Sequence, residues 1–305
     1  MQQHWLCWIL ASCVILGLYD ICKKASIRDN AVFPTLLGST VSGWLALTAF
    51  LLFRGEFAAA ISLPPRQIAL LLVKSGIVGA GWTVTYMALR TLPLTCAVPI
   101  FATGPLWTLL GAILVFAEIP TLVQAAGMAM IVAGCFLFSL SARHEGIDFW
   151  RDRAVWYVLV GTVLSSCSSL YDKHLLNRLG IPTMTVLWWF LGGMCVIYAV
   201  AMALPPVLSR LRRRRCAAES PAPGAAFSWR WSIPVVGVLL AVSDACYFNA
   251  IAVPDARISV LSMIRRLSVV IAFFLGGAVF HETNLLRKAL ALAAILAGAA
   301  ILCLW

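Results

Sequence analysis

The chain has 305 residues, of which 62% are hydrophobic and only 11% are charged, and its formal net charge is +11 at pH 7. A soluble globular domain is roughly half apolar and about a quarter charged. This composition therefore excludes an ordinary soluble protein and indicates a chain that crosses a membrane several times. The basic residues are concentrated in a few loops, so the net charge does not by itself predict an acidic partner such as a nucleic acid.

Ten apolar stretches of membrane-spanning length follow one another along the chain. An α-helix needs about 20 apolar residues to cross the hydrocarbon core of a bilayer. Stretches this long, without strict alternation, are typical of helices and not of barrel strands. We therefore predict an all-α polytopic membrane protein with ten transmembrane helices. The expected spans are residues 5–22, 32–53, 67–90, 96–116, 122–141, 154–176, 184–208, 232–253, 258–280 and 285–304.

Short sequence matches divide the chain into two halves. The matched positions keep their order, and the offset between partners is 148–152 early in the chain and 161–164 later. The matches are Leu18-Tyr19-Asp20 with Leu170-Tyr171-Asp172, Pro34 with Pro182, Tyr86 with Tyr247, Pro93 with Pro254, Glu118 with Glu282, and Gly134 with Gly298. We therefore predict a duplicated five-helix repeat, at residues 1–141 and 154–305, with a connecting loop at 142–153 and a basic flexible loop at 209–231.

An odd number of helices per repeat makes the second copy enter the membrane from the opposite side. Inverted repeats of this kind are the usual basis of alternating access, with the substrate held between the halves near the midplane. Loops after odd-numbered spans hold fifteen basic residues and loops after even-numbered spans hold four, which predicts that both termini lie outside. The run Arg212–Arg215 is interpreted as a topology anchor, with binding of lipid or nucleic acid as the alternative.

Four ionisable residues lie deep inside the expected spans: Lys74, Asp244, Arg265 and Arg266. A charge at bilayer depth costs several kcal/mol and usually lines a wet cavity. Adjacent residues on a helix diverge by about 100°. We therefore expect one arginine to face the cavity while the other snorkels or pairs with Asp244. The alternative is that the acid and the arginine only lock the eighth and ninth spans together.

Polar and aromatic residues at a matching height complete the candidate substrate site. The aromatic members could instead pack against neighbouring helices or lipid, and Trp82 and Thr85 belong to the same expected lining. The residues expected to bind substrate are Arg265, Arg266, Asp244, Tyr247, Asn249, Tyr86, Thr83 and Lys74.

The repeated Tyr-Asp pairs stand at the ends of the first and sixth spans. Asp20 can reach Lys23 or Lys24 by helical spacing, so a helix-end ion pair is one reading. The other reading is a gate used once in each half, formed by Tyr19, Asp20, Tyr171 and Asp172. Glu118 and Glu282 are interpreted as turn or interfacial residues. The ten cysteines and four histidines show no metal-ligand spacing, so neither a metal site nor a cofactor is expected.

The five-plus-five layout resembles the EamA type of the drug/metabolite transporter superfamily. The resemblance is carried by Phe116-Ala-Glu118 and Phe280-His-Glu282, which end the fourth span of each half before a glycine-bearing fifth span. It implies transport of small metabolites, coupled to protons or by exchange, from a central cavity, and no enzymatic activity. The pair Arg265-Arg266 also resembles the basic pair that binds phosphate in the sugar-phosphate branch of that superfamily. Members of the family have cytoplasmic termini, which is opposite to the result of the charge count.

The sequence thus predicts a secondary transporter for a small anionic metabolite that works by alternating access. A lipid flippase on the same fold is the alternative. An intramembrane enzyme is disfavoured, because the chain has no Gly-x-Gly-Asp motif and His281-Glu282 is followed by Thr and Asn. We expect an integral protein of the bacterial inner membrane, monomeric or homodimeric, with protons as the coupling ion and no nucleic-acid partner.

Overall fold

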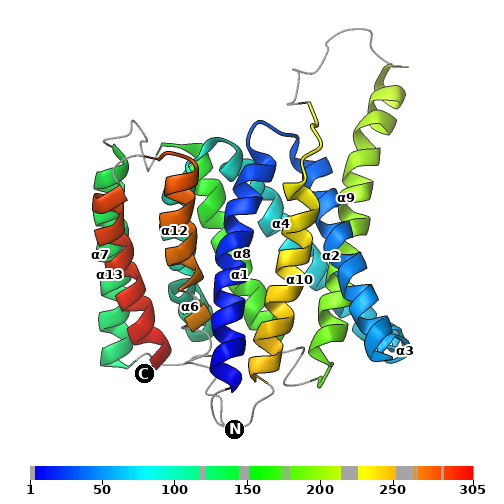
Figure 1. Cartoon of the computed structure of the whole chain (residues 1–305), viewed down its shortest axis with the longest axis horizontal. Helices are drawn as coiled ribbons and strands as arrows, with labels where there is room; N and C mark the ends of the chain where they lie inside the picture. The colour runs from blue at the N-terminus through cyan, green and yellow to red at the C-terminus, as the bar shows by residue number, and fades with distance from the viewer. Residues whose placement is uncertain are drawn as a thin grey trace.

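The computed structural model describes residues 4–116, 121–143, 151–173, 175, 179–213, 226–251, 264–265, 267–282 and 285–304. These residues form helices and no strand, which confirms the predicted all-α class. The helices are α1 (His4–Ile27), α2 (Val32–Arg54), α3 (Phe57–Ile61), α4 (Pro65–Thr91), α5 (Leu94–Ala102), α6 (Gly104–Phe116), α7 (Leu122–Arg143), α8 (Arg153–Lys173), α9 (Thr183–Arg213), α10 (Ser232–Ile251), α12 (Ser268–Val279) and α13 (Leu285–Leu304). Most of them stand side by side, and α1 begins at the same end of the bundle at which α13 ends (Figure 1).

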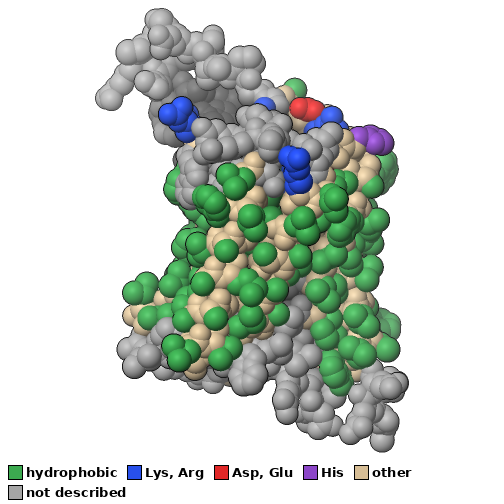
Figure 2. All heavy atoms as spheres, turned by 90° about the vertical axis from the view of Figure 1, so that its left-hand side faces the viewer, with side chains coloured by type: hydrophobic (Ala, Val, Ile, Leu, Met, Phe, Trp, Pro, Cys, Tyr) green, Lys and Arg blue, Asp and Glu red, His purple; other side chains and the backbone are tan. Residues whose placement is uncertain are grey.

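The outer surface of the bundle is apolar, as a lipid-facing surface requires. Within the described residues, six helices are long and apolar enough to cross a membrane, and three shorter apolar helices accompany them. Figure 2 shows hydrophobic side chains over the face formed by α7 and α13, with the visible lysine and arginine side chains gathered at one end. The protein is therefore a polytopic membrane protein. Every predicted span overlaps a described helix, while the number of ten transmembrane helices stays a prediction.

The helix pairs follow a pattern that relates the two halves. Helix α1 packs on α10 and α12, and helix α8 packs on α4 and α6. In addition α2 packs on α9 and α10, α4 packs on α9, and α7 packs on α13. When the helices of the two predicted halves are exchanged, so that α1 takes the place of α8 and α4 that of α10, the contacts of α1 become those of α8, and α2 on α10 becomes α9 on α4. The pairs α2 with α9 and α7 with α13 map onto themselves.

The repeated glycines Gly134 and Gly298 lie at the crossing of α7 and α13. A Cβ atom on Gly298 would lie 2.7 Å from the carbonyl oxygen of Gly127, and one on Gly134 would lie 3.1 Å from that of Ala291. Because these contacts involve backbone atoms, no rotamer change can relieve them. Small residues let helix backbones approach closely in membranes, and this explains why glycine recurs at the matched positions.

The fourth predicted span, residues 96–116, is broken into α5 and α6 around Thr103. Pro105 lies in the first turn of α6, where a missing N–H is tolerated, and it disfavours helical geometry in the residue before it. The sequence analysis missed this break although the proline marks it. The short helix α3 was not predicted either.

The first predicted span ended too early. The helix α1 continues to Ile27, so Lys23 and Lys24 are buried inside it and do not belong to a loop. Lys288, which was also counted as a loop residue, is buried within α13. The predicted span ended before its first charged residues because only apolar residues were counted. A lysine ammonium can nevertheless be buried inside a membrane helix where it has polar partners. Removing these three lysines from the fifteen leaves twelve basic residues against four, so the expected orientation is unchanged.

Candidate functional site

A cavity of about 380 Å³ lies in the bundle, and both halves of the chain contribute to its walls. Helices α1, α4, α5 and α6 line it from the first half, and α8, α10, α12 and Arg265 line it from the second. The volume is within the usual range of ligand pockets. Two ion pairs, several aromatic rings and a row of hydroxyl groups therefore surround one space large enough for a small organic solute.

The first ion pair joins Arg265 to Asp244 of α10 through a terminal guanidinium nitrogen. The guanidinium also lies over the ring of Tyr247, 4.2 Å from its centroid, and both Arg265 and Tyr247 line the cavity. This stacking fixes the plane of the guanidinium. The predicted pairing of Asp244 with an arginine is confirmed, and Arg265 takes the cavity-facing position as well. Arg266 lies outside the described residues.

The second ion pair, Asp20 with Lys23, lies on α1 and also lines the cavity. The ammonium of Lys23 is 4.7 Å from the centroid of the Tyr19 ring and 5.2 Å from that of Phe101. The pairing of Asp20 with a nearby lysine was predicted, but the place of Lys23 in the cavity was not. A usable signal existed, because Tyr19 and Lys23 are four residues apart and so share a helix face.

The other residues predicted to bind substrate lie in different surroundings. Tyr86 lines the cavity and is almost fully buried, and Trp82 and Thr85 line it too. The cavity lining does not include Thr83, whose hydroxyl donates to the carbonyl of Gly79 at 2.8 Å, or the exposed Asn249. A substrate contact at Thr83 or Asn249 therefore stays a prediction without support from the cavity.

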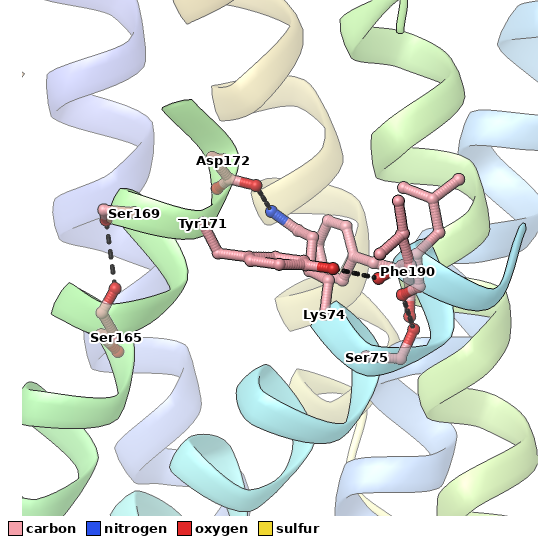
Figure 3. A network of polar contacts seen from close by, with 9 residues as sticks. Lys74, Ser75, Ser165, Ser169, Tyr171, Asp172 and Phe190 are labelled. Carbon is pink, nitrogen blue, oxygen red and sulfur yellow. Dashed lines mark hydrogen bonds and ion pairs between the residues drawn. The ribbon is translucent and has the colours of Figure 1, made fainter. Parts of the chain in front are cut away.

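Lys74 lies away from the cavity lining and forms an ion pair with Asp172 of α8 (Figure 3). Its ammonium is 5.0 Å from the centroid of the Phe190 ring. The hydroxyl of Tyr171 donates to the carbonyl of Leu70 at 3.1 Å. Both residues of the second Tyr-Asp pair therefore bind to α4, and this contact joins one half of the chain to the other.

Hydroxyl groups on one face of α8 form a part of the cavity that the sequence analysis missed. Thr162, Ser165, Ser166 and Ser169 all line the cavity. Their spacing of three, four and seven residues puts them on one side of the helix. This spacing is visible in the sequence. It was missed because a few Ser and Thr residues hardly lower the mean hydropathy of a span, so the stretch was read only as a transmembrane helix.

A junction of charged residues holds the end of α4 to the start of α5. Lys24 donates to the carbonyls of Leu89 and Leu92 at 2.5 and 2.7 Å. The carboxylate of Glu282 accepts from the backbone N–H groups of Leu94 and Thr95 at 2.8 and 2.9 Å, and also from the Thr95 hydroxyl.

The positive charge of Lys24 lies at the C-terminal end of α4, where backbone carbonyls are free, and the negative charge of Glu282 lies at the N-terminal end of α5, where backbone N–H groups are free. Both charges also have the sign that the helix dipole favours at these ends. Lys288 donates to the Thr95 hydroxyl at 2.9 Å and extends the junction into α13. Glu282 is therefore a helix cap that joins the halves, and not simply a turn residue as predicted. Its sequence partner Glu118 lies outside the described residues.

In the described part of the chain, no group of three His, Cys, Asp or Glu side chains is placed so that it could hold a metal ion. The arrangement offers binding groups for an organic solute: guanidinium, ammonium, aromatic rings and hydroxyls.

Comparison with known proteins finds a similarity to one family. Residues 3–140, slightly less than half of the chain, match the model of the EamA-like transporter family. The match supports the predicted resemblance to the EamA type of the drug/metabolite transporter superfamily. No curated protein matches the chain.

The whole length of the chain has a known fold. A solved structure, described only as the crystal structure of a protein, is similar over 99% of this chain and 97% of its own, with a TM-score of 0.61 and 16% sequence identity. At this identity the likeness shows the fold alone. Asp244, Arg265 and the hydroxyl face of α8 lie beyond the residues that match the family model. Their roles therefore depend on the geometry of this chain itself.

Proposed function

We propose that this protein is a secondary transporter that binds a small solute carrying an anionic group in the central cavity and moves it by alternating access. The observation that carries the proposal is the position of two cationic side chains, Arg265 and Lys23, in the lining of a cavity that both halves build. Protons are the proposed coupling ion, with Asp20 and Asp244 as the candidate carriers because each is an acid deep in a helix bundle. The bacterial inner membrane is the proposed location.

The anionic group is proposed because both cations have hydrogen-bond donors to spare. A guanidinium has five N–H donors and an ammonium has three. Arg265 gives a terminal N–H to Asp244, and Lys23 gives one to Asp20. The planar fork of Arg265, held over Tyr247, suits the two oxygens of a carboxylate or phosphate.

The sequence-based reason for an anion was incomplete. It set two arginines and Lys74 against a single buried acid, but Asp20 is also buried and Lys74 has Asp172 as its partner. The preference for an anion therefore depends on free donors at Arg265 and Lys23, and not on a net positive charge of the lining.

Alternating access is supported by the pattern of helix pairs. The main pairs between the halves have counterparts when the halves are exchanged, as α1 on α10 has in α8 on α4, although the contacts of α5 with α12 and α13 have none among the described helices. Inverted five-helix repeats would produce this pattern, since a pseudo-two-fold axis maps each contact onto another. The Lys74–Asp172 pair and the Glu282 junction each join the two halves, and we propose that they open and close in alternation on the two sides of the cavity.

The proposal is tested with the purified full-length chain in proteoliposomes. A panel of small carboxylates and phosphates is first screened for thermal stabilisation of the protein, and uptake of the best binder is then measured. Arg265→Gln is expected to reduce uptake by at least tenfold, and Arg265→Lys to weaken it less, because the charge stays while the planar fork is lost. Arg54→Gln is the matched control, since Arg54 forms an exposed pair with Glu56 outside the cavity.

Two results would contradict the proposal. If the Arg265 to Asp244 pair is only a lock between helices, the double variant Asp244→Asn, Arg265→Gln recovers the uptake that either single variant loses. If the protein is a flippase, proteoliposomes scramble a headgroup-labelled lipid while uptake of soluble anions stays at background.

A further inference from the structure

We infer that the hydroxyl face of α8 selects the substrate, and that the transported anion carries hydrogen-bond donors, as hydroxyl or ammonium groups, on the side away from its anionic group. This inference rests on the proposed function and specifies its substrate class. A polar organic anion would be accepted, whereas a hydrocarbon carboxylate of the same size would be a poor substrate.

The hydroxyl protons of this wall are mostly engaged with the protein backbone. Thr162 donates to the carbonyl of Val158 at 2.8 Å, and Ser169 donates to that of Ser165 at 3.1 Å. Ser166 donates to the carbonyl of Gly104 at 3.0 Å, at the break between α5 and α6. On the adjoining wall, Thr108 of α6 donates to the same oxygen at 3.1 Å.

A hydroxyl group that donates its proton in a hydrogen bond to the backbone still has oxygen lone pairs that can accept another hydrogen bond. The wall formed by α8 and α6 therefore offers mainly acceptors to the cavity. Ser165 and Ser169 are the most exposed members, and Figure 3 shows them apart from the Lys74–Asp172 contact. A solute in contact with this wall gains most if it brings donors of its own, because water loses its access to these oxygens when the solute binds.

The cationic groups belong to a different part of the wall. Lys23 lies on α1, which packs on α10 and α12, whereas α8 packs on α4 and α6. Lysine and arginine side chains carry donors and no acceptor. The cavity thus has a donor wall at Lys23 and Arg265 and an acceptor wall at α8, so a complementary solute has its acceptors at one end and its donors at the other.

The fold itself does not require these hydroxyls. With the offset of 152 that relates the two Leu-Tyr-Asp copies, the face of α8 corresponds on α1 to Leu10, Cys13, Val14 and Gly17, which lack hydroxyls. Packing between helices accounts for Ser166, whose bond crosses to Gly104. The hydrogen bonds of Thr162 to Val158 and of Ser169 to Ser165 stay within α8, so helix packing does not explain why these two residues are polar.

The test compares three six-carbon carboxylates with the purified full-length chain: hexanoate, gluconate and 6-aminohexanoate, whose ammonium is at the end of the chain away from the carboxylate. Binding is measured by thermal stabilisation over a concentration series. We expect gluconate or 6-aminohexanoate to bind at least tenfold more tightly than hexanoate, and the stronger of the two identifies hydroxyl or ammonium as the donor.

In the double variant Ser165→Ala, Ser169→Ala, the ratio of the affinity for the preferred solute to that for hexanoate is expected to fall about tenfold, while the affinity for hexanoate stays constant. Ser168→Ala is the matched control, because Ser168 is buried on α8 outside the cavity lining.

The two proposals fail in different ways. Equal affinity for the three carboxylates, or an unchanged preference in the double variant, overturns the inference about α8 and leaves anion transport standing. If none of the three carboxylates binds, or if Arg265→Gln binds them as the natural chain does, the proposed anion site itself is contradicted.

Discussion

Two copies of Leu-Tyr-Asp, at residues 18–20 and 170–172, lie on α1 and α8, which occupy corresponding places in the bundle, and yet their surroundings differ. Asp20 pairs with Lys23 of its own helix, and the pair lines the cavity. Asp172 pairs with Lys74 of α4, away from the cavity lining. The same motif thus serves the candidate binding site in the first half and the contact between halves in the second.

The residue three positions after each aspartate explains the difference. In the first copy this residue is Lys23, which helical spacing brings back to Asp20. In the second copy it is Leu175, which is fully buried and has no charge to offer. A carboxylate buried without a partner is costly, so Asp172 takes its cation from the neighbouring helix. The copies thus differ in the source of the cation, which is the same helix in the first half and the neighbouring helix α4 in the second.

The largest effect is expected from Lys23→Gln. This change removes a cation from the cavity and leaves Asp20 buried without its partner, a loss that costs about 3–5 kcal/mol in a buried pair. Uptake into proteoliposomes should fall to background, and the thermal unfolding temperature should fall with it. Lys23→Arg, which keeps the charge, separates the two effects and should retain most of the stability. Uptake by Lys23→Gln at the level of the unmodified chain would show that Lys23 has no part in binding.

A smaller effect is expected at the contact between halves. Lys74→Met and Asp172→Asn should each lower the stability, while the double variant should recover part of the loss, with a coupling free energy of about 1–3 kcal/mol. Denaturation of the four proteins in detergent measures this double-mutant cycle. Solute affinity should be unchanged throughout, because neither residue lines the cavity. A coupling near zero would mean that the pair does not hold α8 to α4.

The smallest effect is expected from Tyr171→Phe. The substitution removes one hydrogen bond, from the Tyr171 hydroxyl to the carbonyl of Leu70, and such a bond contributes about 1 kcal/mol. The free energy of unfolding should fall by about that amount, and solute affinity should be unchanged. Tyr19→Phe is the comparison, since Tyr19 lines the cavity and its change should appear in solute affinity. Equal behaviour of the two variants would remove the distinction between the copies.

The helices were predictable because the cost of unpaired backbone groups in lipid leaves a long apolar stretch almost no other structure. The pairing of Asp244 with an arginine was predictable because both residues are charged and deep in neighbouring spans. Lys23 was missed because a charge was read as the end of a span, although its partners lie within one helical turn.

The Lys74–Asp172 pair could not be predicted from spacing, since its members are 98 residues apart in the chain. Only the packing of α4 on α8 brings them together. The hydroxyl face of α8 was missed for another reason: its periodicity is in the sequence, but only the cavity distinguishes it from serines that pack between helices.

The junction at the end of α4 has a consequence for how the chain is assembled in the membrane. Lys24 finds its carbonyl partners at Leu89 and Leu92, which are synthesised soon after it, so its charge is satisfied within the first half. The N–H groups of Leu94 and Thr95 have to wait for Glu282, and Lys288 in the last helix reaches back to the same threonine. These contacts can therefore form only after the last helices have been synthesised, and they complete a polar contact that the early helices leave open.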